Sequence, residues 1–557
     1  MRVSEGVVSQ PIEPTEPIDL SGELPVVQTL TAADVSGILE ELAAYHAEFA
    51  HLFKRPEQRL GAEIYLRGLL TADVPRKNVE AMVLRLFGSG SDADRRVRAL
   101  QQFIGESPWD DQAILAQHHR LVGQSLGEAD GVSILDGSDF PKQGHLSVGV
   151  ARQWCGATGK KDPPQAGQAG VFLGYASRKG YTLLDRRLYL PASWFGEEHQ
   201  ALWQACQIPT GTEFHTKPEL AAEMVEQLLQ ARPIPGCWVA CDEGFGDNPR
   251  LLDRVTAAGL WYLAEVAKAT TVWPLVEPEG VEPEGVEPGG KERARPTTWV
   301  PERAASGHGR APTKERVQPA SPAKLRLDGF SEEIAPSAWQ RFRLLEGAKG
   351  PLVADFVAFR ALAVRNELPG PEVWVLIRRK VSDEEAEPKN KFYLSNAPAD
   401  TPLAESVRVA GMRWPIESAF EEAKGELGLD QYELRFWRGW HHDMTLAILA
   451  HHFLSRLRRL LNQREGGPKA GGQAPGSRSG NTPPRLRSGA GASLAWPDSA
   501  PNPSRPAQLG PGTSTASSHS AATVYRPGGD TGDPLLPATP QGRLLPIPSQ
   551  TTPPTLA

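Results

Sequence analysis

The sequence predicts an α/β protein with an N-terminal helical domain, a β-rich insertion in its core and a disordered C-terminal tail. Three observations support this. Apolar residues recur at helical spacing early in the chain, and from Gly131 short apolar strands alternate with amphipathic helices. The last part is rich in glycine and proline, with seventeen of the 50 prolines after residue 463. Such a segment cannot bury enough apolar surface to fold.

The 557 residues divide into six predicted segments. A five-residue repeat, VEPEG, fills residues 276–290 and indicates an exposed spacer. The segments are a disordered acidic lead (1–30), a helical DNA-binding domain (31–125), the first part of the core (126–270), a linker with the β-rich insertion (271–400), the last part of the core (401–463) and a low-complexity tail (464–557).

Composition excludes several classes of protein. A net charge of −7 is not that of a polycationic protein, and four cysteines are too few for a disulfide scaffold. The chain has no apolar segment long enough to span a bilayer and no apolar stretch of the signal-peptide kind at its N-terminus. We therefore expect a cytoplasmic protein with no membrane partner.

Helices are expected first in the chain and again near its end. Thr31 is a plausible N-cap for the first of them, and the basic side chains of the N-terminal helices suggest contacts with a DNA backbone, unless they are simply solvated helix faces. The expected helices are 32–53, 59–70, 78–87, 92–104, 219–232, 402–425 with a break near Pro415, and 440–461.

Strands are expected between these helices, and two of them end in an aspartate. The expected strands are 132–136, 145–150, 169–176, 181–190, 237–242, 260–266, 352–364, 373–379 and 392–395. Asp136 and Asp242 are the two terminal acids. An acid at the end of a buried strand costs desolvation energy unless it is paired or binds a metal. The pair therefore suggests a carboxylate cluster for a divalent cation such as Mg²⁺.

A late helix offers a third carboxylate. Arg413, Glu417, Glu421 and Lys424 share one helical face, and Pro415 is typical of a first helical turn. That places Glu417 near the helix N-terminus, where the helix dipole favours an ionised carboxylate. By spacing alone, the same face could be an ordinary solvated one.

These residues resemble a known family, the bacterial insertion-sequence transposases of the DDE class (SRSO-type endonuclease superfamily). The resemblance is to the branch with a Tyr-x2-Arg-x3-Glu-x6-Lys signature, and Arg413, Glu417 and Lys424 match its last three members. Ala410 stands in the tyrosine position. The segments LDGSDFPKQG (135–144) and CDEGFG (241–246) also resemble that branch.

The resemblance implies a ribonuclease-H-like core in which Asp136, Asp242 and Glu417 are the catalytic residues and metal ligands. They would bind two Mg²⁺ ions, for which Mn²⁺ would substitute. The implied activity is cleavage of double-stranded DNA at transposon ends and strand transfer into target DNA, by a homodimer on DNA in the nucleoid. Lys142, Arg310, Arg413 and Lys424 are the candidate DNA-binding residues.

Several alternatives stay open. Asp139 could replace Asp136, although it is expected in a turn, and Glu421 or Glu422 could replace Glu417. The protein could also be a catalytically decayed relative that still binds DNA. A glycosidase with paired carboxylates would leave the Arg/Lys frame around Glu417 unexplained.

Overall fold

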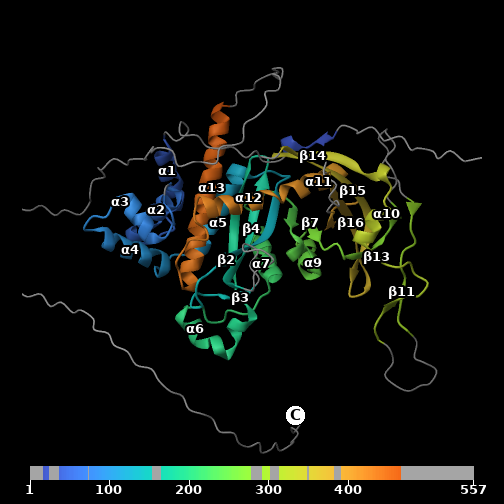
Figure 1. Cartoon of the computed structure of the whole chain (residues 1–557), viewed down its shortest axis with the longest axis horizontal. Coiled ribbons are helices and arrows are strands. Elements are labelled where there is room, and N and C mark those ends of the chain that lie inside the picture. The colour runs from blue at the N-terminus through green and yellow to red at the C-terminus, as the bar shows by residue number, and fades with distance from the viewer. Residues whose placement is uncertain are drawn as a thin grey trace, which may run out of the picture. The chain divides into compact units, whose positions relative to one another are not determined.

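The computed structural model describes residues 17–23, 37–72, 74–153, 165–277, 291–301, 313–347, 350–381 and 390–465. The predicted tail beyond residue 465, the repeat from 278 to 290, Thr31 and Arg310 lie outside these ranges. In the described part, helices and strands combine into a mixed α/β fold built on one large sheet (Figure 1). No helix there is both long enough and apolar enough to cross a membrane.

Five strands form the central part of this sheet, in the order β5-β4-β2-β6-β7. β2 pairs antiparallel with β4, and β4 with β5, whereas β6 runs parallel to both β2 and β7. The strands are β2 (Val132–Pro141), β4 (Gln165–Ser177), β5 (Gly180–Tyr189), β6 (Trp238–Cys241) and β7 (Trp261–Val266).

The strands of the predicted insertion extend the same sheet instead of forming a separate one. β17 pairs antiparallel with β7, and β16, β15 and β14 follow it outward. β1, from the predicted disordered lead, pairs with β14, so the lead contributes a short strand. These strands are β17 (Lys391–Ser395), β16 (Leu368–Lys380), β15 (Gly350–Arg365), β14 (Gln340–Gly347) and β1 (Ile18–Asp19), with β8 (Thr271–Pro274) and β13 (Leu325–Arg326) pairing off the main path.

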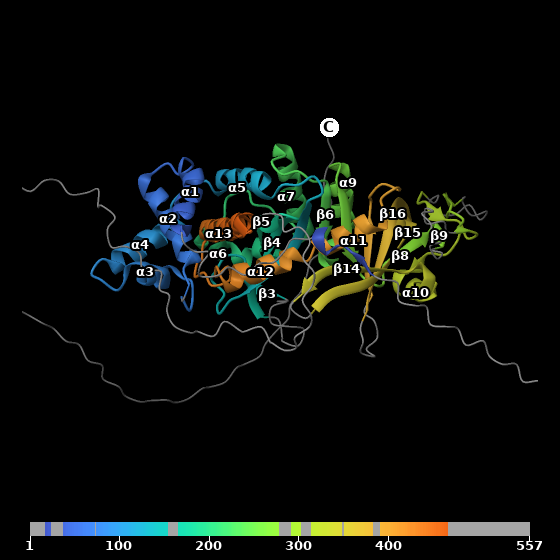
Figure 2. The same ribbon diagram turned by 90° about the horizontal axis from the view of Figure 1, so that it is seen from above.

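Helices cover both faces of the sheet (Figures 1 and 2). α11 (Leu403–Met412), α12 (Pro415–Gly425) and α13 (Trp437–Glu465) pack on one face, and α7 (Lys217–Ala231) and α9 (Pro249–Ala257) on the other. The predicted break near Pro415 is confirmed, because two residues separate the end of α11 from the start of α12.

The N-terminal helices pack against α13, so they share a core with the last helix that the structure describes. Asn78 caps α3 by accepting a hydrogen bond from Ala81 N–H at 2.9 Å, a common role of asparagine at a helix N-terminus. The helices are α1 (Ile38–Ala50), α2 (Pro56–Leu70), α3 (Val79–Phe87), α4 (Ala93–Gly105) and α5 (Asp111–Leu126), the last of which the sequence analysis did not predict.

One strand prediction is wrong, and another strand continues past its predicted end. Residues 145–150 form bends and a turn, with Gly149 at a φ of 71°, and the strand begins only at β3 (Ala151–Gln153). β2 also continues five residues past Asp136, because its antiparallel partner β4 pairs with it as far as Pro141. Asp139 therefore lies in a strand and not in a turn.

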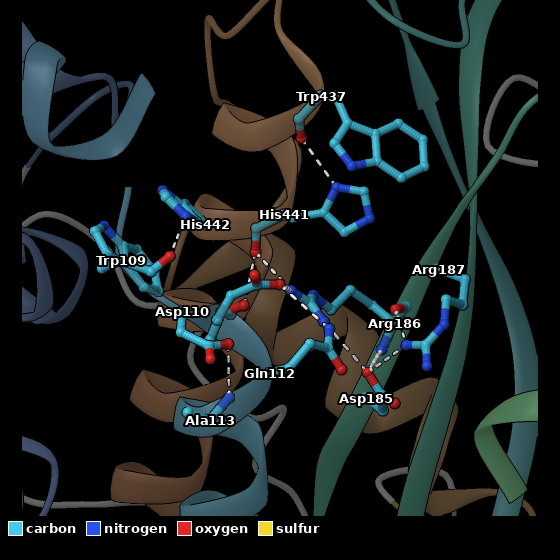
Figure 3. Close-up of polar contacts among 12 residues, drawn as sticks. Trp109, Asp110, Gln112, Ala113, Asp185, Arg186, Arg187, Trp437, His441 and His442 are labelled. Carbon is cyan, nitrogen blue, oxygen red and sulfur yellow. Dashed lines mark hydrogen bonds and ion pairs between the residues drawn. The ribbon is translucent and has the colours of Figure 1, made fainter. Parts of the chain in front are cut away.

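A buried arginine joins three elements of the fold (Figure 3). The side chain of Arg186 on β5 is fully buried and forms ion pairs with Asp111 of α5 and with Asp185, at 3.3 Å in the second case. It also donates a hydrogen bond to the carbonyl oxygen of His441 on α13 at 3.1 Å. Burial, the largest single effect, raises the pKa of Asp111, but the charge and hydrogen bond of Arg186 together with the charges of His441 and His442 lower that pKa to about 2.

We predict that Arg186→Met lowers the free energy of unfolding by roughly 3–5 kcal/mol, since it leaves buried carboxylates without their partner. Arg120→Met is the matched control: Arg120 is exposed, and within the described ranges its side chain bonds only to the nearby Gln117, so its loss should cost less than about 0.5 kcal/mol. Urea unfolding followed by circular dichroism measures both. Equal stability of the two variants would contradict a structural role for this ion-pair network.

Candidate active site

Three carboxylates stand in one row across neighbouring parallel strands. The register pairs Leu135 with Cys241, and Cys241 with Ala264. The next residue of each strand is an acid: Asp136, Asp242 and Glu265, respectively. Leu135, Cys241 and Ala264, which precede these acids, belong to the hydrophobic core on the side of the sheet that α7 and α9 cover. Since side chains alternate along a strand, all three acids face the opposite side, under α11 and α12.

The same alternation separates Asp139 from the row. Asp136 and Asp139 are three residues apart in one strand, so their side chains point to opposite faces of the sheet. Asp139 cannot complete the cluster that Asp136 forms. The alternative that it replaces Asp136 is therefore disfavoured by the geometry.

Arg413 and Glu417 complete the cluster from the helical layer. Arg413 caps the end of α11, and its Nη2 donates to Oε1 of Glu417 at 2.6 Å, one helical turn on in α12. The same guanidinium lies 4.0 Å from Oδ2 of Asp136 and 3.8 Å from Oε2 of Glu265. Its side chain is only 11 % exposed, so the arginine is a largely buried cation among three acids.

Glu265 is a member of this cluster that the sequence analysis missed. Lys391, its neighbour on β17, donates to both carboxylate oxygens of Glu265, at 2.7 and 3.0 Å. A signal was present, because Glu265 is the single charged residue in an otherwise apolar strand. Its meaning depended on the register of β6 and β7, which brings Glu265 level with Asp242.

Burial disfavours the ionised form of the aspartates in this row. The pKa of Asp136 is raised to about 7, first by burial and then by the charge of Asp242, while Arg413 and the Gly137 N–H oppose the rise. Burial also raises the pKa of Asp242, although the Phe245 N–H that this carboxylate caps acts against it. The positive charge of Arg413 is thus not enough to bring the pKa values of Asp136 and Asp242 back to their ordinary range.

The chemistry of this donor set fits a hard divalent cation. Carboxylate oxygens are the ligands that Mg²⁺ and Mn²⁺ prefer, and a crowded pair with a raised pKa gains most from a nearby positive charge. Within the part of the chain that the structure describes, no group of three or more acids, histidines or cysteines is spaced to hold a metal ion. At present the guanidinium of Arg413 occupies the space between the carboxylates.

The two alternatives to Glu417 differ in their surroundings. Glu422 binds Arg458 at 2.7 Å and the hydroxyl of Tyr181 at 2.7 Å, and it contacts His451. Burial by itself raises its pKa, but these partners, His451 first, lower it to about 2. Glu422 thus links α12 to β5 and α13, and its carboxylate points to these partners. Glu421 is exposed and remains a matched comparison for Glu417.

The structure does not bring all four predicted DNA-binding residues together. Arg413 lies in the row, and Lys424 lies on α12 with its Nζ 5.6 Å from the centre of the Phe140 ring. Lys142 follows β2, six residues beyond Asp136 and so about 20 Å along the strand at ~3.3 Å per residue. Arg310 lies outside the described residues.

The fold and this acidic row define a mixed α/β protein with a carboxylate site at the edge where parallel strand pairing ends. Residues 48–326 match the family model described as DDE superfamily endonuclease. This match spans half of the chain, and the chain belongs to that family. It covers Asp136, Asp242 and Glu265 but ends before Glu417. No curated protein matches the sequence.

Membership of this family makes the protein a DDE-type endonuclease, whose substrate is DNA. The family resemblance expected from the sequence is confirmed at this level. The aspartates of the acidic row lie inside the matched segment, so the row is the natural candidate for the active site.

We predict that Asp136→Asn stabilises the metal-free protein at pH 8 but not at pH 4. A carboxyl whose pKa is raised in the folded state costs stability as the pH rises from its unfolded value, near 4, to about 7. The gain at pH 8 should be about 1–4 kcal/mol, from ~1.4 kcal/mol per pKa unit. Thermal unfolding in EDTA across this pH range measures it. A gain that does not vary with pH would contradict the charge argument.

Proposed function

We propose that this protein is a DDE transposase that cleaves DNA at the ends of an insertion sequence and transfers the freed strand into target DNA. The observation that carries the proposal is the row of Asp136 and Asp242 facing Glu417 across the guanidinium of Arg413. A row of acids on one buried face needs a strongly cationic ligand, and a phosphodiester bound through divalent cations meets that need.

The strand order supports a ribonuclease-H-like core. Three antiparallel strands are followed by a helix and two strands parallel to the first, with the acids on the first and fourth strands and on a late helix. This is the arrangement that the sequence resemblance implies. The Arg-x3-Glu-x6-Lys spacing supports membership of the signature branch. In this chain Ala410, buried on α11, stands where that branch has its tyrosine.

Asp136, Asp242 and Glu417 would bind two Mg²⁺ ions, or Mn²⁺ in their place. Bound there, the cations would polarise the scissile phosphate and stabilise the charge that develops on the attacking and leaving oxygens. The residues of the chain orient the DNA around them. Arg413 presents a planar fork of donors suited to a phosphate, and Lys424 one turn beyond Glu421 adds a point charge.

The reaction consists of two in-line displacements at phosphorus. Water first displaces a 3′ oxygen at the element end, and the freed 3′-OH then displaces a 3′ oxygen in the target strand. The layer of α11 and α12 over the row limits the access of solvent to the carboxylates, since Asp136 and Glu265 are only 15 % and 12 % exposed.

The N-terminal helices would hold the DNA near this row. Exposed arginines on α4 and the preceding segments, including Arg55, Arg59 and Arg95, suit contacts with phosphates. Because two ends must be cut in concert, a homodimer on DNA is part of the proposal, as is a place at the nucleoid. A decayed relative would keep these DNA contacts and lose the cleavage.

We predict that DNA carrying the flanking ends of the gene is nicked by the wild-type protein in Mg²⁺ or Mn²⁺. Glu417→Gln should reduce the rate by about 100-fold or more, since even outer partners of metal ligands cost 10–100-fold. Glu421→Gln, the same chemical change on an exposed residue of the same helix, should cut at the wild-type rate.

Gel analysis of end-labelled DNA measures these rates, and fluorescence anisotropy measures binding. If neither wild type nor variant cuts but both bind the ends, the decayed DNA-binding protein replaces the transposase. Equal loss in Glu417→Gln and Glu421→Gln would contradict the role assigned to Glu417.

A further inference from the structure

A polar cavity of about 760 Å³ lies beyond the end of β2, away from the acidic row. Three segments distant in sequence form its walls: the α2–α3 connection, the stretch that follows β2, and the loop between α12 and α13. It lies between the N-terminal helical layer and the sheet. Its lining residues are Arg76, Pro141, Lys142, Gln143, Ser147, Asp430, Tyr432, Glu433, Leu434 and Arg435.

The cavity is held in shape by buried contacts. Lys77 donates through Nζ to the carbonyls of Leu69 and Glu426, and its backbone N–H donates to the side chain of Gln431 at 2.7 Å. Below the cavity the hydroxyl of Tyr432 donates to Gln168 at 2.7 Å and accepts a bond from Trp440 at 3.2 Å. The loop that carries the lining acids is therefore fixed to both the helical layer and the sheet.

Lys142 forms part of the floor of this cavity. Its Nζ lies 3.4 Å from the centre of the Tyr432 ring and donates to the Tyr432 carbonyl at 3.3 Å. Burial lowers its pKa to about 8, although the negative charge of Asp443 acts in the opposite direction. An additional negative group in the cavity would favour the charged form of this lysine.

The lining mixes hydrogen-bond donors and acceptors. Lys142 and Arg435 donate, whereas Asp430 only accepts, and Gln143 does both. Among the described residues the side chain of Asp430 has neither a hydrogen bond nor an ion pair, while Glu433 pairs with Arg76 at 3.3 Å. A surface that bound only phosphates would need donors alone. Acceptors beside donors suit the edge of a nucleic-acid base, whose amino groups bind carboxylates.

β2 connects the cavity with the proposed cleavage site, because Asp136 lies within this strand and Pro141, its last residue, lines the cavity. Lys142 is about 20 Å along β2 from Asp136, which corresponds to roughly six base-pair steps of B-form DNA at ~3.4 Å each. A duplex cut at the acidic row and running along β2 would therefore reach the cavity with an internal nucleotide.

We propose that this cavity holds one nucleotide of the bound DNA end and reads its base through Asp430 and Gln143, with Lys142 and Arg435 on its phosphate. The inference rests on the proposed function, because it takes DNA at the acidic row as given. It adds a site of sequence recognition within the core, separate from the N-terminal helices.

The test compares the affinity for flanking-end DNA with that for a scrambled duplex, by fluorescence anisotropy at several salt concentrations. Asp430→Asn should reduce the ratio of the two affinities by roughly 5- to 100-fold, as expected for one lost base contact. Arg435→Ala should weaken both affinities about equally and lower the salt slope by about one. Asp400→Asn, which changes an exposed residue in the loop between β17 and α11 that does not line the cavity, is the matched control and should bind as wild type does.

Each outcome bears on a different claim. If wild type prefers its flanking DNA and Asp430→Asn keeps the same preference, the cavity does not read a base and this inference is overturned. If wild type shows no preference at all, the proposed function and the inference both fail. Hydrogen–deuterium exchange of the 426–435 loop in Asp430→Asn separates lost contact from local unfolding: faster exchange without DNA would assign any loss to unfolding and overturn the inference.

Discussion

The arginine between the carboxylates is the interaction on which the rest of the site depends. Asp136, Glu265 and Glu417 come from three elements, and Arg413 is the cation that contacts all of them. Lys391 adds a second cation from β17. Without these charges the sheet edge would hold buried like charges with no partner, at a cost of several kcal/mol per ion.

This constraint explains why distant parts of the chain meet at one edge. The break between α11 and α12 places Arg413 over the row and Glu417 one turn away, and Pro415 fits the first turn of the new helix. β17 joins β7 and so delivers Lys391 to Glu265. The strands of the insertion thus support the acidic row by extending the sheet that carries it.

Much of the site could be predicted from local patterns. Asp136 and Asp242 stood out because a charged residue directly follows a short apolar run, and the frame of Arg413 and Glu417 follows from helical spacing. Glu265 could not be found in that way, because its role depends on strand register. Glu422 is distinguished from Glu417 only by its contacts with α13, which no local pattern reveals.

The parts of the fold that escaped prediction are also set by pairing between distant segments. β2 continues beyond Asp136 because β4 still pairs with it there. Residues 145–150 are apolar enough for a strand, but they form a turn against the α12–α13 loop, where the Val148 N–H donates a hydrogen bond to the Arg435 carbonyl. Lys142 is close to Asp136 in sequence but about 20 Å away, because the intervening residues are extended.

The most direct test of the central claim is the binding of Mn²⁺ to the DNA-free protein, measured by isothermal titration calorimetry. We expect the wild type to bind the ion and Asp242→Asn to bind it at least 10-fold more weakly, while Asp400→Asn matches the wild type. Unchanged binding in Asp242→Asn, or no binding in the wild type, would show that the carboxylate row is not a metal site.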